Sequence, residues 1–318
     1  MIELQQLTKK YGEKTAVDGL TATIRPGMVT GFLGPNGAGK STTMRSIIGL
    51  DRPTSGRALV NGHPFRRSRA PLAEVGALLD AKAMDGGRTA RAHLLALGAT
   101  VGVGPRRVQE VLDVVGLSMV AGRSTRQFSL GMGQRLGIAA TLLADPQVLI
   151  LDEPVNGLDL DGVQWLRRLL RELADEGRTV LLSSHLMSEM ELVADHLLII
   201  GQGRLLADTS LAEFIDRSTG GAVRVTSPDA TALVELLVRD GSVSTTPVAP
   251  GTVEVIGLRP AQIGDLAAAH GLRIHELAPV AGSLEHAYLR LTQHSVEYTG
   301  TSEQQQSPAV GTTSRTAA

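Results

Sequence analysis

The stretch from Gly34 to Thr42 restricts the fold of this chain more than any other. It reads Gly-Pro-Asn-Gly-Ala-Gly-Lys-Ser-Thr, which fits the phosphate-loop pattern of glycine, four residues, then Gly-Lys-Ser. Residues 28–33 before it have the apolar character of a buried strand, and residues 44–48 after it carry an apolar face at helical spacing. A strand, a glycine loop and a helix in this order predict an anion site, whereas a glycine-rich turn that binds nothing is the alternative.

Each part of this loop has an expected role toward a phosphate chain. Glycines let backbone N–H groups turn inward, and the helix N-terminus adds roughly half a positive charge. Lys40 is expected to neutralise the β- and γ-phosphates, and the Ser41 hydroxyl to hold Mg²⁺. The expected binding residues are Gly34, Pro35, Asn36, Gly37, Ala38, Gly39, Lys40, Ser41 and Thr42.

A second motif places carboxylates at the end of a strand. Residues 148–151 are all apolar, as in a central parallel strand, and Asp152-Glu153 follow directly. At such a strand tip Asp152 can reach Mg²⁺ and Glu153 can polarise an attacking water. His185 ends the next strand, and right-handed crossover rules bring the two tips to the same edge. The alternatives are an acidic turn and a solvated histidine.

Composition bounds the class of protein. The chain has 318 residues, enough for about two domains, and a net charge of −1, so no basic field points to nucleic acid. Cysteine is absent, which excludes disulfides and thiolate metal sites. The N-terminus lacks a signal-peptide pattern, and no apolar stretch approaches the roughly 20 residues that span a bilayer. Work at a membrane would therefore need a partner.

The first 216 residues are expected to form one α/β domain. Residues 2–7 and 16–24 predict an antiparallel opening ahead of the phosphate loop. Between about 89 and 144 the pattern becomes helical, which predicts an all-helical insertion within the α/β core. Its helices are expected at 90–98, 105–115 and 130–144.

Residues 222–292 are expected to form a second, smaller domain after a linker at 217–221. Its order of elements is the split βαβ pattern of ferredoxin-like domains, followed by a helix at 283–291. The strands and helices are expected at 222–226, 230–239, 243–246, 252–256, 260–269 and 272–277. No catalytic or metal-ligand pattern is present here, so a regulatory or dimer-stabilising role is expected, with simple shielding as the alternative. The tail, 293–318, is poor in apolar residues and is expected to be disordered.

Together these motifs resemble the ATP-binding subunit of an ABC transporter, over roughly residues 1–216. The octapeptide at 128–135, Phe-Ser-Leu-Gly-Met-Gly-Gln-Arg, resembles the family signature Leu-Ser-Gly-Gly-Gln. Ser129 and Gly131 are retained, while Phe128, Leu130 and Met132 depart from it. The two retained residues can present a hydroxyl and a bare backbone to a γ-phosphate.

The resemblance implies a fold and further site residues. The fold is a P-loop NTPase core of the ABC ATPase type, with an antiparallel β subdomain, a helical subdomain and a small α+β ferredoxin-like C-terminal domain. Gly157-Leu158-Asp159 resembles the D-loop, which makes Asp159 a nucleotide-site residue. His185 resembles the switch histidine, and Tyr11 the aromatic residue that stacks on adenine. From the pattern alone, packing under its turn is the alternative for Tyr11.

One departure concerns coupling to a partner. After the strand at 75–79 the family usually places a glutamine that touches Mg²⁺ and senses the permease, whereas this chain has Asp80. A carboxylate can still reach Mg²⁺ or a water, so Asp80 joins Ser41 and Asp152 as an expected metal-side residue. The acidic residue here, the weak signature and the small C-terminal domain look most like subunits of bacterial exporters of antibiotics or lipid-like compounds.

The resemblance also implies a mechanism and partners. ATP and Mg²⁺ would be held on one subunit, with Lys40, Glu153 and His185 as catalytic residues. Ser129 and Gly131 of a second copy would close over the γ-phosphate, so a homodimer is expected. Opening and closing would drive a separate permease from the cytoplasmic face of the membrane, without nucleic acid.

Two other classes of ATPase remain as alternatives. A DNA-repair ATPase would place a long coiled coil between Lys40 and Ser129, and a translation factor would carry two phosphate loops. The sequence has neither feature.

Overall fold

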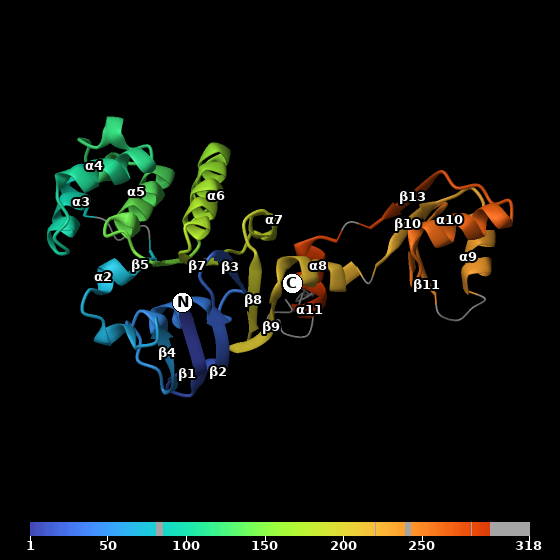
Figure 1. Cartoon of the computed structure of the whole chain (residues 1–318), viewed down its shortest axis with the longest axis horizontal. Coiled ribbons are helices and arrows are strands. Elements are labelled where there is room, and N and C mark those ends of the chain that lie inside the picture. Colours follow the sequence, from blue (N-terminus) through green and yellow to red (C-terminus); the bar gives the residue numbers. More distant parts are fainter. Residues whose placement is uncertain (81–84, 220, 239–242, 281, 293–318) are drawn as a thin grey trace, which may run out of the picture.

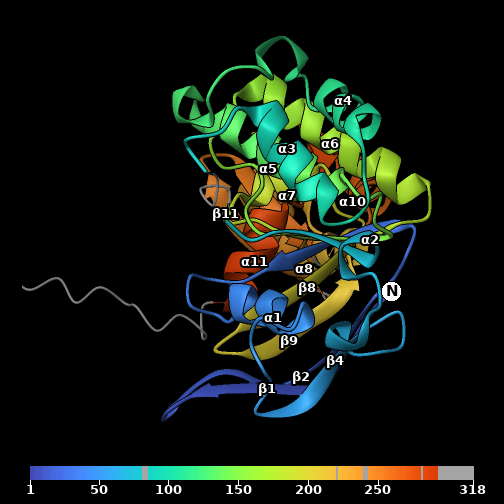
Figure 2. The ribbon, with the colours of Figure 1, turned by 90° about the vertical axis from the view of Figure 1, so that its left-hand side faces the viewer.

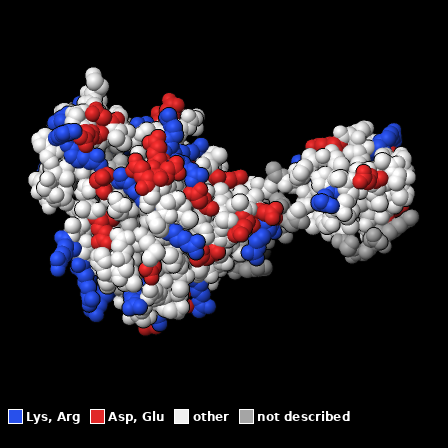
Figure 3. Space-filling view, viewed as in Figure 1, with Lys and Arg blue, Asp and Glu red and all other residues white. Residues whose placement is uncertain are grey.

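The computed structural model describes residues 1–80, 85–219, 221–238, 243–280 and 282–292. Two sheets and most helices form an N-terminal body, and a third sheet lies apart from them along the longest axis (Figure 1). On the face drawn in Figure 3, basic and acidic side chains are interspersed, and a narrower neck joins the two parts. Nowhere in the described residues is a helix both long and apolar enough to cross a membrane.

The N-terminal residues of the body form a three-stranded antiparallel sheet. Its order is β2-β1-β4, with β1 paired to both neighbours. Ile2 and Leu4 alternate with polar residues along β1, and a register shift between Leu4 and Leu7 brings Leu7 into the same core, so one face of the sheet is buried. The strands are β1 (Ile2–Tyr11), β2 (Lys14–Ile24) and β4 (Ser55–Val60).

The central sheet has six strands in the order β5-β6-β7-β3-β8-β9. The first five run parallel and β9 is antiparallel to β8. Because parallel strands end at the same edge, the segments after β3, β6 and β7 meet there. The strands are β3 (Met28–Leu33), β5 (Val75–Leu78), β6 (Val148–Leu151), β7 (Thr179–Ser183), β8 (His196–Gly201) and β9 (Arg204–Ser210). Helices α1 (Lys40–Ile47), α6 (Leu160–Asp175) and α7 (Met187–Glu191) follow β3, β6 and β7.

The helices expected between about residues 89 and 144 are present as α3 (Ala90–Ala99), α4 (Pro105–Val114) and α5 (Leu130–Leu142). They lie at the opposite end of the body from β1, β2 and β4 (Figure 2). Helix α5 packs directly on β5, because a Cβ at Gly76 would lie 2.3 Å from the Thr141 carbonyl oxygen. The short helix α2 (Pro71–Glu74) precedes β5 and is not part of this group.

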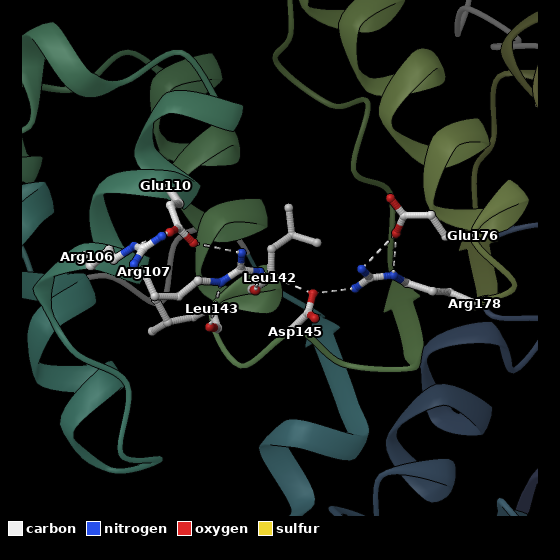
Figure 4. A network of polar contacts seen from close by, with 8 residues as sticks. All are labelled: Arg106, Arg107, Glu110, Leu142, Leu143, Asp145, Glu176 and Arg178. Carbon is white, nitrogen blue, oxygen red and sulfur yellow. Dashed lines mark hydrogen bonds and ion pairs between the residues drawn. The ribbon is translucent and has the colours of Figure 1, made fainter.

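A polar network ties these helices to the central sheet (Figure 4). Arg107 of α4 donates to the Leu142 carbonyl oxygen at the end of α5 (3.0 Å) and to Asp145 (3.2 Å). Asp145 also accepts from Arg178 (2.9 Å), which in turn donates to Glu176 (2.8 Å). The turns that lead into β6 and β7 are therefore held to α4 by shared charges.

The C-terminal sheet is antiparallel throughout, in the order β11-β12-β10-β13. Its core contains Val225 and Val255 from the sheet with Leu233 and Ile263 from the helices. The elements are β10 (Val223–Thr226), α9 (Ala230–Val238), β11 (Ser244–Ala249), β12 (Thr252–Ile256), α10 (Pro260–Ala269) and β13 (Glu276–Pro279).

The last strand of this sheet lies later than the sequence predicts. The expectation of a strand at 272–277 is wrong for its first half. There the Leu272 N–H donates to the Ala267 carbonyl oxygen (2.9 Å) in the turn that ends α10. Arg273 is engaged by Asp229, with its Nη2 2.8 Å from Oδ1. Pairing with β10 therefore starts at Glu276.

The two segments that flank the small sheet also differ from expectation. Helix α8 (Leu211–Thr219) continues into the expected linker at 217–221. Helix α11 (Leu284–Thr292) packs on α8 and α7 of the body, not on the small sheet. Leu284 is fully buried in the main core, because the body offers α11 an apolar cover. The small domain was expected to end at residue 292, but α11 belongs to the body, so the domain ends before this helix. The tail, 293–318, lies outside the described residues.

Candidate functional site

The phosphate loop connects β3 to α1 and requires glycine at close contacts. A Cβ at Gly34 would lie 2.5 Å from the Ile200 carbonyl oxygen, and one at Gly39 would lie 2.4 Å from that of Ala16. Gly39 also has a φ of +106°, which an L side chain rarely adopts. These contacts press the loop against β2 and β8, so its backbone is fixed before any ligand binds.

Lys40 is the first residue of α1 and points back into the loop. Its Nζ donates to the carbonyl oxygens of Gly34 (2.6 Å) and Pro35 (3.3 Å). Burial lowers the pKa of Lys40, and the carboxylates of Glu153 and Asp152 oppose that shift. The ammonium group is thus held inside the loop by acceptors that phosphate oxygens can replace.

Two serines hold the strand tip at residues 152–153: Ser41 of the loop and Ser183 at the end of β7. The Ser41 hydroxyl donates to Asp152 Oδ2 (2.6 Å), and the Ser183 hydroxyl donates to Asp152 Oδ1 (2.5 Å). Ser183 Oγ also accepts from the Glu153 N–H (2.9 Å). Ser183 is fully buried and was not anticipated from the sequence. Its place at the end of the strand beside β6 was the available signal.

Glu153 and His185 form a pair at the rim of this network. His185 Nδ1 lies 2.7 Å from Glu153 Oε2, and the His185 N–H donates to the same oxygen at 3.3 Å. Glu153 has a φ of +51°, a left-handed conformation that costs a non-glycine residue about 1–3 kcal/mol. The hydrogen bonds of Glu153 to Ser183 and His185 maintain this strained backbone, and they orient the carboxylate toward His185.

A cavity of about 400 Å³ lies over the loop, a size typical of small-molecule sites. Tyr11 forms one wall, about half exposed, with its hydroxyl donating to Asp51 (2.8 Å) and Lys9 Nζ 4.7 Å from its ring centroid. The described lining residues are Tyr11, Lys14, Ala16, Asn36, Gly37, Gly39, Lys40, Ser41, Thr42, Asp152 and Glu153. Lys14 and Ala16 were missed from the sequence, because strand residues facing a ligand follow no motif.

The remaining expected site residues do not line this cavity in the described structure. Ser129 caps α5, accepting from the Met132 N–H (3.2 Å), and Asp159 caps α6, accepting from the Gly162 N–H (2.9 Å). Gly131 lies against Gly157, since a Cβ there would be 2.7 Å from the Gly157 carbonyl oxygen. The signature and D-loop segments therefore contact each other.

Asp80 follows β5, the strand beside β6. The Asp152 N–H donates to the Leu78 carbonyl oxygen (2.8 Å), so Asp80 stands two residues beyond a residue bonded to Asp152. Asp80 is exposed and absent from the cavity wall as described.

Ser41 and Asp152 suit Mg²⁺ because both present oxygen atoms at one point of the cavity. Mg²⁺ is usually bound by one or two carboxylates together with substrate phosphates and waters. Within the described ranges no group of three or more His, Cys, Asp or Glu residues could hold a metal by itself. The donor set therefore fits a metal that arrives with a phosphate ligand.

Comparisons with known proteins agree with this geometry. Residues 17–156 match the family described as ABC transporter, and residues 221–285 match a domain of unknown function. The chain is 42% identical over 211 residues to the bacitracin transport ATP-binding protein BcrA of Bacillus licheniformis, covering 65% of this chain and 69% of that protein. It is 36% identical over 308 residues to the uncharacterized ABC transporter ATP-binding protein YhcH of Bacillus subtilis (strain 168), covering 93% and 97%.

A similar solved structure is described as a dimeric bacterial ABC transporter cassette. Its TM-score is 0.62 at 25% identity, and the match covers 66% of this chain and 99% of the cassette.

Proposed function

Because the chain belongs to the family of ABC transporter ATP-binding proteins, we propose that it powers the export of a peptide-antibiotic or lipid-like compound through a separate membrane permease. The observation that carries this proposal is the hydrogen-bonded series Ser41, Asp152, Ser183, Glu153 and His185 beside the phosphate loop. The similar protein from Bacillus licheniformis is named as a bacitracin transport protein, which supports the export class.

ATP binds in the cavity over the phosphate loop. Tyr11 offers its exposed ring face to the base, and the loop amides and Lys40 receive the phosphates. Ser41 and Asp152 would hold Mg²⁺, which when bound neutralises charge on the phosphate oxygens. Lys40 exchanges its bonds to the Gly34 and Pro35 carbonyl oxygens for bonds to phosphate oxygens. Its ammonium group can therefore neutralise the phosphates while the backbone of the loop stays in place.

Glu153 takes a proton from the attacking water as general base. Its N–H is anchored on Ser183, and its Oε2 is held by both the ring and the N–H of His185. This anchoring leaves Oε1 available to the water. His185 thereby orients the base, and the strained backbone of Glu153 keeps it at the cavity wall.

A second copy of the chain completes the site. Ser129 and Gly131 lie away from the cavity of their own chain as described, and a similar cassette is dimeric. Leu130 and Leu160, beside the signature and D-loop segments, are 55% and 82% exposed, which is unfavourable for leucine unless a partner covers them. In this arrangement each copy closes its signature over the γ-phosphate bound by the other, as a homodimer at the cytoplasmic face of the membrane.

Dimer closure is tested with Glu153→Gln, which binds ATP but lacks the general base and should hydrolyse it about 10²–10⁴-fold more slowly. In sedimentation velocity it should form dimers with ATP and Mg²⁺, and EDTA should reduce them. The matched control Glu153→Gln with Lys40→Ala should stay monomeric. A Glu153→Gln protein that remains monomeric at saturating ATP would contradict the shared site.

The export class is tested apart from the ATPase. The chain is expressed with its permease in a bacitracin-sensitive strain, and Lys40→Ala serves as the control. Equal sensitivity of the two strains to peptide antibiotics would remove this substrate class, and leave the ATPase assignment in place.

A further inference from the structure

Three consecutive residues of α7 each hold a different element. Glu189 accepts from Arg167 Nε of α6 at 3.0 Å. Met190 is fully buried against β3, where a Cβ on Gly31 would lie 2.5 Å from its Sδ. Glu191 accepts from the Leu284 N–H of α11 at 3.0 Å. The position of this short helix is therefore set jointly by α6, β3 and α11.

Helix α11 docks at this point through both charge and apolar contact. The Leu284 N–H is one of the donors that a helix N-terminus leaves unpaired, and the Glu191 carboxylate satisfies it from another segment. The side chains of Leu284 and Ala287 are at most 3% exposed, inside the apolar cover of the body. Glu191 thus acts as an N-terminal cap supplied by a different helix.

The other end of α7 reaches the catalytic pair. The Met190 N–H donates to the Leu186 carbonyl oxygen (3.1 Å), and the Leu186 N–H donates to Ser184 Oγ (3.0 Å). His185 lies inside this bonded turn and meets Glu153 at 2.7 Å. A tilt of α7 would therefore move the ring that orients the general base.

The small C-terminal sheet is attached to the body at two points close to α7. Helix α11 follows the small sheet and α8 precedes it in the chain, and the two helices pack together (Figure 1). Residues 222–280 thus leave and rejoin the body at the α8–α11 pair. Through its bond to Glu191, α11 therefore links the chain that leaves the small sheet to α7.

We propose that Glu191 is a positioning residue for the pair His185–Glu153, and that the small C-terminal domain regulates ATP hydrolysis through the contact between α11 and α7. This regulation rests on the proposed function, since it acts on the same catalytic pair. Binding of a partner at the small sheet would change the turnover rate without touching the nucleotide.

The test compares Glu191→Ala with Glu285→Ala in the full-length protein. Glu285 is exposed on the first turn of α11, so its removal weakens the helix N-terminus without breaking the contact to α7. Glu191→Ala should lower kcat by about three- to tenfold with KM for ATP unchanged, whereas Glu285→Ala should keep the wild-type kcat. Glu191→Gln keeps an oxygen acceptor and should restore most of the activity.

Hydrogen exchange and a double-mutant cycle distinguish a positioning role of Glu191 from general destabilisation of the protein. Hydrogen exchange of residues 184–193 should increase in Glu191→Ala and not in Glu285→Ala. In a His185→Ala background, Glu191→Ala should have no further effect on kcat, because the two changes act through one ring. Equal kcat in wild type and Glu191→Ala, or additive losses with His185→Ala, would overturn the inference. A wild-type protein that neither binds nor hydrolyses ATP would instead overturn the proposed function.

Discussion

Ser183→Ala removes two hydrogen bonds at once from a fully buried position. The hydroxyl donates to the charged Asp152 Oδ1 at 2.5 Å and accepts from the Glu153 N–H at 2.9 Å. Losing a bond to a charged group and leaving its partners unsatisfied costs about 2–3 kcal/mol in the free energy of unfolding. We expect the melting temperature of the body to fall by about 5–10 °C. The loss of the anchor on Glu153 should also lower kcat by roughly tenfold or more.

Thr30→Val is the matched control for this prediction. Thr30 is a fully buried residue of β3, and its Oγ1 has no hydrogen-bond partner among the described residues. Replacing that hydroxyl with a methyl group should leave the melting temperature unchanged or raise it slightly. Both variants are compared by thermal unfolding and by steady-state ATPase assay. If Ser183→Ala matched wild type in both, the bonds through Ser183 would not organise the site.

Three further outcomes follow from named groups. Lys40→Ala should abolish binding of a fluorescent ATP analogue, since the phosphates lose their charged partner; unchanged affinity would exclude the phosphate-loop assignment. Asp80→Gln should leave basal ATPase activity near wild type and alter its stimulation by the permease in proteoliposomes; an altered basal rate with normal stimulation would count against a coupling role. Arg273 lowers the pKa of Asp229 to about 2, so this pair stabilises the small domain at neutral pH and the contribution is lost as the pH falls toward 2. Arg273→Gln should return that pKa toward 3.8 in a carboxyl NMR titration, and an unmoved pKa would refute the cause.

The sequence predicted those parts of the site that short spacing determines. The glycines of the loop, Lys40 and the strand tip at Asp152 each lie in a short pattern that predicts a phosphate or metal site, and the fold brings Gly37, Gly39, Lys40 and Asp152 to one cavity. The parallel order of strands then placed His185 beside Glu153, because crossover rules leave few other positions. The expectation of a βαββαβ order in the C-terminal part rested likewise on alternation that each element shows locally.

What the sequence could not provide depends on contacts between distant segments. Ser183 looks like any strand-end serine until β7 is paired with β6. Lys14 becomes a cavity residue only because β2 passes over the loop. Leu284 was assigned to the small domain because it follows that domain in the sequence. In the structure its side chain is buried in the main core, where α11 packs on α7 and α8. Such choices are tertiary and have no local signature.

The small sheet is an insertion between α8 and α11, not an appendage at the end of the chain. Cutting the gene after α8 would therefore remove a piece of the body's own core together with the small sheet. A clean excision would instead join residue 219 to residue 282 with a short loop and keep α11 in place. Because both ends of the small domain join the body at the α8–α11 pair, the domain is held by two attachments, which restrict its rotation more than a single hinge would.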